Sequence, residues 1–390
     1  MRVPRGWVFC VAGLTVCLLG AALARGQAGS AAPAEQRPLL SEHAFKNVQV
    51  LRGIPVKEFM ETMGFFSAAL ALNCSDCHGE TGGWADYAND TPLKQMSRRM
   101  IVMVNALNRA SFGGAPAVTC YTCHRGSPRP KVIPSLAQQY SVPPDVDPDE
   151  IQPLPAARAT LTAEQILDRY IEAIGGAAAA ARLTSYTAKG MYEGFDSDFE
   201  QVPVDIYARA PDRRATVIHM RAGESITTYD GREAWAAGPP DLTPVTLMSL
   251  VGESLSGARL DAQLAFPGQI KQILTDWRTG FPPLSIDDRP VAVIDGRTRE
   301  GSRVKLYFDN ETGFLVRSVR YSTTAVGTVP ITAVYSNYRD VPSLGVTIPY
   351  TWQVTWTNGR GTYNITSVQP NVAIEAARFG RPTPPTRAPN

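Results

Sequence analysis

The sequence has few of the residues that build metal sites, disulfides and strongly charged surfaces. Its 390 residues include only four histidines and six cysteines, and 38 lysines and arginines nearly balance 36 aspartates and glutamates, for a net charge of +2. So small a net charge argues against a nucleic acid or a membrane surface as the main partner. The sequence contains no nucleotide-binding glycine loop, nucleophile elbow or metal-spaced carboxylate cluster. The few cysteines and histidines are therefore the best guide to function.

Four of the six cysteines lie in two copies of a Cys-x-x-Cys-His motif, at Cys74–His78 and Cys120–His124. This motif is the attachment signature of a c-type haem, because two thiols add to the porphyrin vinyl groups and the histidine binds the iron. The alternatives are a zinc site made of two cysteine pairs and a redox-active Cys-x-x-Cys, and neither requires a histidine after both pairs. The sequence thus predicts two covalently bound haem c groups. Their attachment residues would be Cys74, Cys77, Cys120 and Cys123, with His78 and His124 as axial iron ligands.

The N-terminus has the pattern of a secretory signal peptide. Arg2 and Arg5 precede an apolar run from Trp7 to Leu23, which ends in a small-residue cleavage pattern. We expect residues 1–24 to be a cleaved signal peptide and residues 25–40 to be disordered. The alternative is a retained anchor helix, which would make the protein membrane-associated. Either way we expect the protein outside the cytoplasmic membrane, in the periplasm, where c-type haem is attached.

Residues 41–130 are predicted to form a small, mainly α domain. One helix is expected from Pro55 toward Leu72, and a second begins after the N-cap Thr91, with Pro92 at its first position, and runs to about Ala110. Each helix precedes one of the two motifs and carries methionines whose thioethers are candidate second iron ligands. Spacing alone does not choose among them, since methionine also fills cores. These candidates are Met60, Met63, Met96, Met100 and Met103, with His43 as a further alternative.

Residues from about 45 to 130 resemble the photosynthetic reaction-centre cytochrome c subunit family. The resemblance is carried by residues 47–51, 58–63, 98–100 and above all 118–126, Val-Thr-Cys-Tyr-Thr-Cys-His-Arg-Gly. It implies that Met63 binds the iron of the haem attached at Cys74 and Cys77, and that Met100 binds the iron of the other haem. Family members that serve purple-bacterial reaction centres have four haems, so this chain looks like one half of that subunit. The implied partners are redox donor and acceptor proteins, among them a membrane-bound reaction centre or respiratory complex.

A proline-rich linker is expected at residues 131–158, and a different domain at residues 159–380, followed by a disordered tail at 381–390. A capping box at Thr162–Gln165 opens an amphipathic helix, and most of the remaining pattern alternates as strands do, with a helical segment at about 244–274. The predicted fold is α+β, with a curved antiparallel sheet or half-barrel. This part resembles the LolA/LolB-like lipoprotein-carrier fold, on residues 166–176, 229–232, 309–317, 335–339 and 348–349. That resemblance implies an acyl or lipid ligand.

These observations together indicate an exported dihaem c-type cytochrome that transfers single electrons, with photosynthetic electron transport implied by the family. We expect an electron carrier rather than an enzyme, and no catalytic residue is identified. Two alternatives remain at this point. One is a lipid or lipoprotein carrier with accessory haems, and the other is a haem enzyme whose iron keeps an open position.

Overall fold

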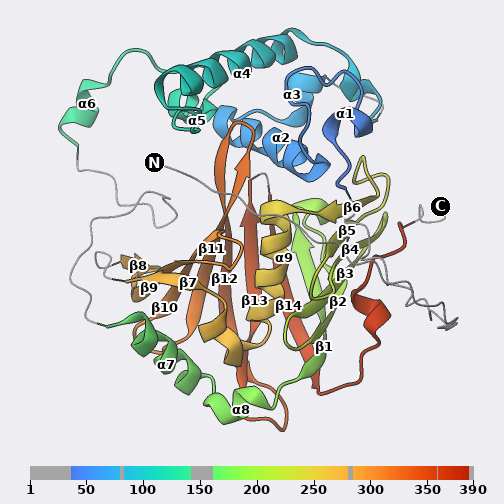
Figure 1. Ribbon diagram of the computed structural model, residues 1–390, viewed down its shortest axis with the longest axis vertical. Helices are drawn as coiled ribbons and strands as arrows, with labels where there is room; N and C mark the ends of the chain where they lie inside the picture. The colour runs from blue at the N-terminus through green and yellow to red at the C-terminus, as the bar shows by residue number, and fades with distance from the viewer. Residues whose placement is uncertain (1–36, 80–82, 142–160, 280–283, 358, 386–390) are drawn as a thin grey trace, which may run out of the picture. The chain divides into compact units, whose positions relative to one another are not determined.

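The computed structural model describes residues 37–79, 83–141, 161–279, 284–357 and 359–385 (Figure 1). The expected signal peptide, most of the segment expected to be disordered, the C-terminal part of the expected linker and the end of the tail lie outside the described residues. None of the helices in these ranges has both the length and the hydropathy that a membrane span requires.

The first part of the described chain is helical, as predicted. Its elements are α1 (Ser41–Ala44), α2 (Val56–Leu70), α3 (Cys74–His78), the 3-10 helix η1 (Asp86–Ala88), α4 (Pro92–Ser111), α5 (Cys120–His124) and α6 (Leu136–Gln139). Helix α4 begins where the sequence predicts, because the Thr91 side chain accepts a hydrogen bond from the backbone N–H of Lys94 (3.2 Å). Pro92 follows at the first helical position, where its missing N–H costs nothing. Helix α2 ends at Leu70, before Ala71 in the left-handed conformation.

The expected linker contains one piece of regular structure. Helix α6 forms a single turn at Leu136–Gln139. Eight residues without proline lie between Pro134 and Pro143, which leaves room for one helical turn.

The rest of the described chain combines a few helices with many strands. The helical elements are α7 (Ala163–Ala173), α8 (Ala177–Ala181), α9 (Gly252–Leu264), η3 (Pro267–Gln272) and η4 (Ala376–Phe379). The strands are β1 (Ser185–Gly194), β2 (Val202–Arg209), β3 (Arg213–Met220), β4 (Gly223–Tyr229), β5 (Ala234–Ala237), β6 (Leu247–Leu250), β7 (Thr275–Arg278), β8 (Leu284–Ile286), β9 (Arg289–Arg297), β10 (Arg303–Asp309), β11 (Leu315–Thr324), β12 (Gly327–Asp340), β13 (Thr347–Trp356) and β14 (Gly359–Pro370).

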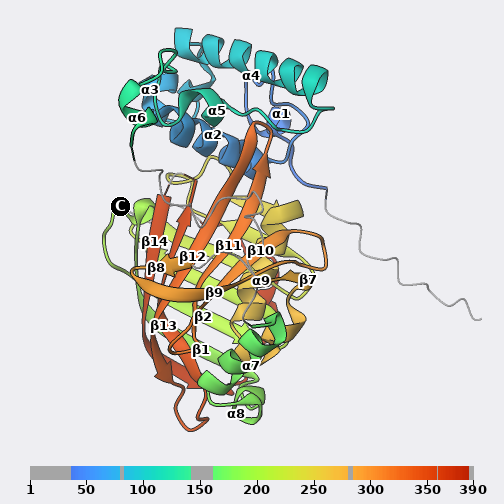
Figure 2. The same ribbon diagram turned by 90° about the vertical axis from the view of Figure 1, so that its left-hand side faces the viewer.

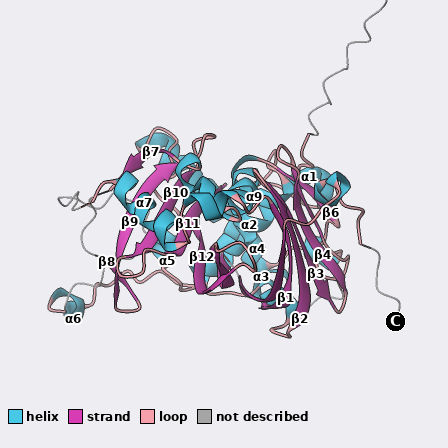
Figure 3. Cartoon of the chain, turned by 90° about the horizontal axis from the view of Figure 1, so that it is seen from below, coloured by secondary structure: helices cyan, strands magenta, loops and turns pink. Residues whose placement is uncertain are grey.

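The described strands form one antiparallel sheet of 14 strands, in the order β6-β5-β4-β3-β2-β1-β14-β13-β12-β11-β10-β9-β7, with β8 paired to β9. Pairing of β1 with β14 joins the strands that begin this region to those that end it. Within the described residues β6 and β7 are edge strands, so the sheet stays open. Figure 3 shows the strands curving around α9. The predicted curved antiparallel sheet is confirmed.

The helical segment predicted at about 244–274 is only partly correct. Helix α9 and η3 lie within residues 252–272 of this segment, but residues 247–250 form strand β6, which pairs with β5. The short apolar run in this region fits either a strand or a helix, and pairing with a neighbouring strand decides the outcome.

The main core lies between the sheet and the helices on its concave side. Ile166, Leu167 and Tyr170 from α7 and Leu260 from α9 are buried there against sheet residues such as Ile206. The predicted capping box holds the start of α7, since Thr162 Oγ1 accepts from Gln165 N (3.2 Å) and Gln165 Oε1 accepts from Thr162 N (2.9 Å). Burial of each such Ile or Leu contributes about 1.5–3 kcal/mol, which favours the closed packing of helix on sheet.

A second, smaller core joins the helical region to the sheet. The hairpin of β11 and β12 extends to α2, as Figures 1 and 2 show, and Val326 and Val329 at its tip are buried with Phe65 of α2. Glu61 of α2 accepts a hydrogen bond from Ser322 of β11 (2.6 Å). The helical region and the sheet therefore share a packed contact.

Candidate functional site

Both Cys-x-x-Cys-His motifs form five-residue helices, α3 and α5. Each helix is capped by its own third residue. Asp76 Oδ2 accepts from the backbone N–H of Asn73 (2.7 Å), and Thr122 Oγ1 accepts from that of Thr119 (3.0 Å). One helical turn brings residues three apart onto the same side, so the two thiols of each motif share a face and the histidine follows directly.

The His78 ring is fixed by Tyr87, which lies between the two motifs in the sequence. Its Nδ1 lies 3.1 Å from the Tyr87 carbonyl oxygen, and the two rings stack with centroids 4.5 Å apart. A carbonyl oxygen only accepts, so Nδ1 carries the proton and Nε2 keeps its lone pair. Burial lowers the pKa of His78, and the charge of Lys94 lowers it further, against the effect of the Tyr87 hydrogen bond. The ring is therefore held neutral with Nε2 ready to bind a metal ion.

The His124 ring is held in the same way by a different carbonyl. Its Nδ1 lies 3.0 Å from the carbonyl oxygen of Ser127, in the turn that follows α5. Since a carbonyl oxygen only accepts, Nδ1 carries the proton of this hydrogen bond, and Nε2 lies outside the contact. The histidines at equivalent positions in the two motifs therefore both use Nδ1 for a hydrogen bond to a backbone carbonyl.

Neighbouring helices hold each motif in place. Thr91 Oγ1, at the start of α4, donates to the Cys77 carbonyl (2.5 Å), and Lys94 Nζ donates to the Tyr87 carbonyl (2.8 Å). For the second motif, Gly126 N donates to the Ala69 carbonyl at the end of α2 (2.9 Å). The buried Asn108 side chain donates to Val118 O (2.8 Å) and accepts from Val118 N (2.9 Å).

In each motif one thiol has a raised pKa. Burial raises the pKa of Cys77, with smaller contributions from the charges of Asp76 and Cys74. Burial also raises the pKa of Cys120. Reactive thiol pairs require the opposite, a lowered pKa that yields a thiolate at neutral pH.

The candidate methionines differ in exposure. Met63 is half-buried against the smaller core and Met100 is half-buried on α4, whereas Met96 and Met103 are 46% and 51% exposed. Met60 is half-buried, and the alternative ligand His43 is exposed in α1. The Met96 sulfur already accepts a hydrogen bond from Arg99 (3.7 Å). This bond favours Met100 over Met96 as a ligand on α4.

Helix α4 also presents apolar side chains on its surface. Leu93, Met96, Met103 and Leu107 are exposed and recur at helical spacing. Exposed apolar patches mark surfaces that bind a ligand or partner. Paired thiols, an available imidazole nitrogen, thioethers on the preceding helix and an apolar surface are together what a covalently attached haem requires, so the residues present fit two such groups.

Sequence reasoning missed the residues that hold the motifs, namely Tyr87, Lys94 and Asn108. No local pattern marks them, because each contact joins a side chain to a backbone carbonyl 5 to 10 residues away. Elsewhere, His219 lies between Asp205 (3.0 Å) and Glu224 (3.2 Å), which gives both ring nitrogens a partner. In the described ranges no three His, Cys, Asp or Glu residues gather into a group that could hold a metal ion by themselves.

Comparison with known proteins confirms the resemblance of the helical region. Residues 22–175 match the family model described as Photosynthetic reaction centre cytochrome C subunit. The photosynthetic reaction center cytochrome c subunit of Thermochromatium tepidum is 41% identical over 98 residues, which are 24% of this chain and 23% of that protein. The corresponding subunit of Rubrivivax gelatinosus is 38% identical over 98 residues, 24% of this chain and 25% of that protein. This chain thus spans about a quarter of the length of each relative.

The C-terminal region is similar to solved LolA-like structures. The LolA superfamily protein from Nitrosomonas europaea aligns with 57% of this chain and 99% of its own, at 15% sequence identity and a TM-score of 0.37. The strand order and the antiparallel pairing described above define the fold of this region.

Proposed function

We propose that this chain is an exported c-type cytochrome that carries two covalently attached haems and transfers single electrons. The observation that carries the proposal is the repeated site geometry. In both α3 and α5 a capped helical turn carries two cysteines three residues apart, and a backbone carbonyl holds the histidine Nδ1 and leaves Nε2 available. The similarity of residues 22–175 to reaction-centre cytochrome c subunits supports the same conclusion.

Each residue has a defined task in this proposal. Cys74 and Cys77 would attach one haem and Cys120 and Cys123 the other, while His78 and His124 would each bind an iron. Met63 and Met100 would supply the second protein ligand to each iron, as the family resemblance implies. Haem iron supplies reversible one-electron chemistry, and a thioether ligand raises its reduction potential.

The packing around the motifs suits electron transfer. The carbonyls of Tyr87 and Ser127 keep the imidazoles in one orientation, so that little rearrangement accompanies a change of charge. With a histidine and a methionine bound to each iron, no position would remain for a substrate, which would distinguish this function from that of a haem enzyme.

The similarity to reaction-centre cytochrome c subunits supports a proposal for the partners and the location. We infer an electron donor and an acceptor at the periplasmic face of the cytoplasmic membrane, with a membrane-bound reaction centre or respiratory complex as one of them. The N-terminal apolar run would export the chain. Purification of the chain from its host with crosslinked partners would test this, and recovery from the cytoplasm without haem would contradict it.

The experiment that tests the haem assignment is the intact mass of the exported chain, produced in a host that matures c-type cytochromes. We expect the mass of the polypeptide plus two haems. The double variant Cys74→Ala/Cys77→Ala should lose one haem, and Cys120→Ala/Cys123→Ala the other. An unchanged haem content in either variant would contradict the proposal.

A further inference from the structure

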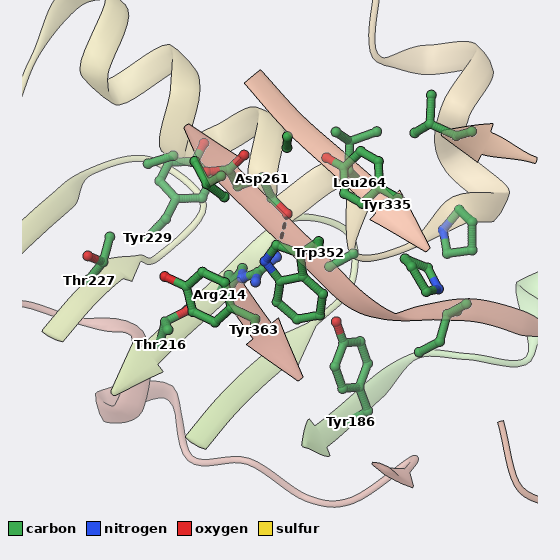
Figure 4. A pocket seen from close by; sticks show the side chains of 18 of the residues that line it. Tyr186, Arg214, Thr216, Thr227, Tyr229, Asp261, Leu264, Tyr335, Trp352 and Tyr363 are labelled. Atoms are coloured by element: carbon green, nitrogen blue, oxygen red, sulfur yellow. Dashed lines mark hydrogen bonds between the residues drawn. The ribbon is translucent and has the colours of Figure 1, made fainter. Parts of the chain in front are cut away.

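The concave side of the sheet contains a cavity that the electron-transfer proposal does not use. It encloses about 190 Å³ beneath α9, bounded by strands from both halves of the sheet (Figure 4). Pockets for drug-sized ligands usually measure about 300–1,000 Å³, so this cavity fits a smaller molecule, of one or two rings.

Aromatic rings form much of the cavity wall. Trp352 and Tyr363 stack with centroids 5.1 Å apart and planes at 15°. Tyr186 and Tyr335 also line the cavity, and Figure 4 shows them on either side of Trp352. Tyr186 is buried, whereas Tyr335, Trp352 and Tyr363 are half-buried. Flat walls of this kind favour a flat ligand, because stacked rings gain contact and quadrupole energy together.

One positive charge faces this aromatic wall. Among the described residues that line the cavity, Arg214 is the single cation. Its guanidinium lies 5.6 Å from the Trp352 ring centroid, and its Nη1 donates to the Asp261 carbonyl oxygen (3.0 Å). Burial raises the pKa of the Tyr186 and Tyr363 hydroxyls, and the charge of Arg214 opposes that rise. The charge of Asp261, which also lines the cavity, adds to the rise for Tyr363.

The guanidinium is suited to bind a ligand oxygen. Arginine has five N–H donors in one plane, and the Asp261 carbonyl takes one of those on Nη1. The neighbouring hydroxyls of Thr216 and Ser225 add short-range donors and acceptors. A charge-assisted hydrogen bond at the end of an aromatic slot provides both affinity and orientation.

From this geometry we propose that the cavity binds a small planar aromatic compound whose ring stacks on Trp352 and whose oxygen accepts hydrogen bonds from Arg214. The oxygen belongs to a carboxylate or to a neutral carbonyl, which share this chemistry. An acyl chain, by contrast, gains no stacking on Trp352 and can match the guanidinium only through a terminal carboxylate, which leaves the rest of its length without a polar partner. The proposal is independent of the haem assignment.

The test is calorimetric titration of the full haem-loaded chain, kept oxidised, with 2-naphthoate, 1,4-naphthoquinone and laurate. We expect at least one aromatic probe to bind more tightly than laurate. Tighter binding of 2-naphthoate identifies a carboxylate as the natural group, and tighter binding of 1,4-naphthoquinone identifies a neutral carbonyl.

Two substitutions locate the binding. Arg214→Leu should weaken the preferred aromatic probe about tenfold or more, and Trp352→Leu about threefold to tenfold. The matched controls Arg221→Leu, at an exposed turn, and Trp356→Leu, on the same strand but outside the cavity, should leave the affinity unchanged. Arg214→Lys and Trp352→Phe, with haem absorption and circular dichroism as checks of folding, separate lost binding from lost structure.

Three results would overturn the proposal. These are preferred binding of laurate, no binding of either aromatic probe, and aromatic binding that persists in folded Arg214→Leu protein at the original affinity.

Discussion

Gly327, at the turn between β11 and β12, lies directly against the ring of Phe65 on α2. A Cβ atom at position 327 would come within 2.6 Å of Phe65 Cζ and 3.0 Å of the Thr119 methyl group, next to the second motif. The sheet therefore contacts the helical region through a hairpin tip that tolerates no side chain, and this contact lies beside Cys120, which shares the same buried cluster.

Substitution of Gly327 tests this contact. We expect Gly327→Ala to lower the free energy of unfolding by about 1–3 kcal/mol, because an added methyl group overpacks the site. Denaturant titration of the full chain, followed by haem absorption and circular dichroism, measures the effect. In a Phe65→Ala background the same change should cost clearly less, since the ring is gone. Equal costs in the two backgrounds would show that the contact is absent.

Asn108 is expected to be essential for the second motif. Its buried amide makes two hydrogen bonds to Val118, two residues before Cys120. Asn108→Ala removes both and leaves the Val118 backbone groups without partners, at a cost of about 2–3 kcal/mol. The control Asn105→Ala, on the same helix, should change the stability little. If the two variants unfold at the same denaturant concentration, the amide does not hold the loop.

The methionine ligands can be identified one at a time. Met63→Leu and Met100→Leu should each convert one haem to a high-spin form, remove half of the methionine-to-iron absorption in the near-red, and lower one reduction potential, because axial ligands tune haem potentials over a range of about 0.8 V. Met96→Leu is the control, since the Met96 sulfur is bound by Arg99. Loss of the band in the control, or its full retention in Met63→Leu, would require a different assignment.

Glu58 predicts a pH dependence of stability. Burial raises its pKa above the ordinary value, and the charges of Glu61 and Glu253 raise it further. The folded state therefore binds this proton more tightly than the unfolded state, so Glu58 lowers the stability as the pH rises from the unfolded pKa through the folded one. Glu58→Gln should raise the free energy of unfolding at pH 7 and lose that advantage below about pH 4, near the ordinary carboxyl pKa.

The control for this prediction is Glu172→Gln on the exposed surface of α7. Denaturant titrations at several pH values compare the two variants with the unmodified chain. A constant difference between Glu58→Gln and the unmodified chain over the whole pH range would mean that the carboxyl group has an ordinary pKa in the folded state.

What could be predicted from the sequence was mostly local. Helix α4 was predictable because Thr91 and Pro92 mark its start, and α7 because Thr162 and Gln165 cap each other. Strand β6 was not, since its identity depends on pairing with β5. The contact between Glu61 and Ser322 joins residues 261 positions apart, and no local pattern encodes such a separation.

The candidate functional site was likewise predictable from local sequence only in part. The cysteine and histidine positions are set by a five-residue motif and were predicted directly. The groups that orient the histidines, such as the carbonyl of Tyr87, are backbone atoms that any residue type could supply. The aromatic cavity around Arg214 was not predicted either, because its walls come from strands far apart in the sequence.

The measurement that tests the central claim most directly is a spectroelectrochemical titration of the exported, haem-loaded chain. The account predicts that two electrons per chain are taken up and released reversibly, in two one-electron steps, with low-spin spectra in both oxidation states. Uptake of fewer than two electrons, or a high-spin ferrous form that binds carbon monoxide readily at both irons, would contradict a dihaem electron carrier with both iron faces filled.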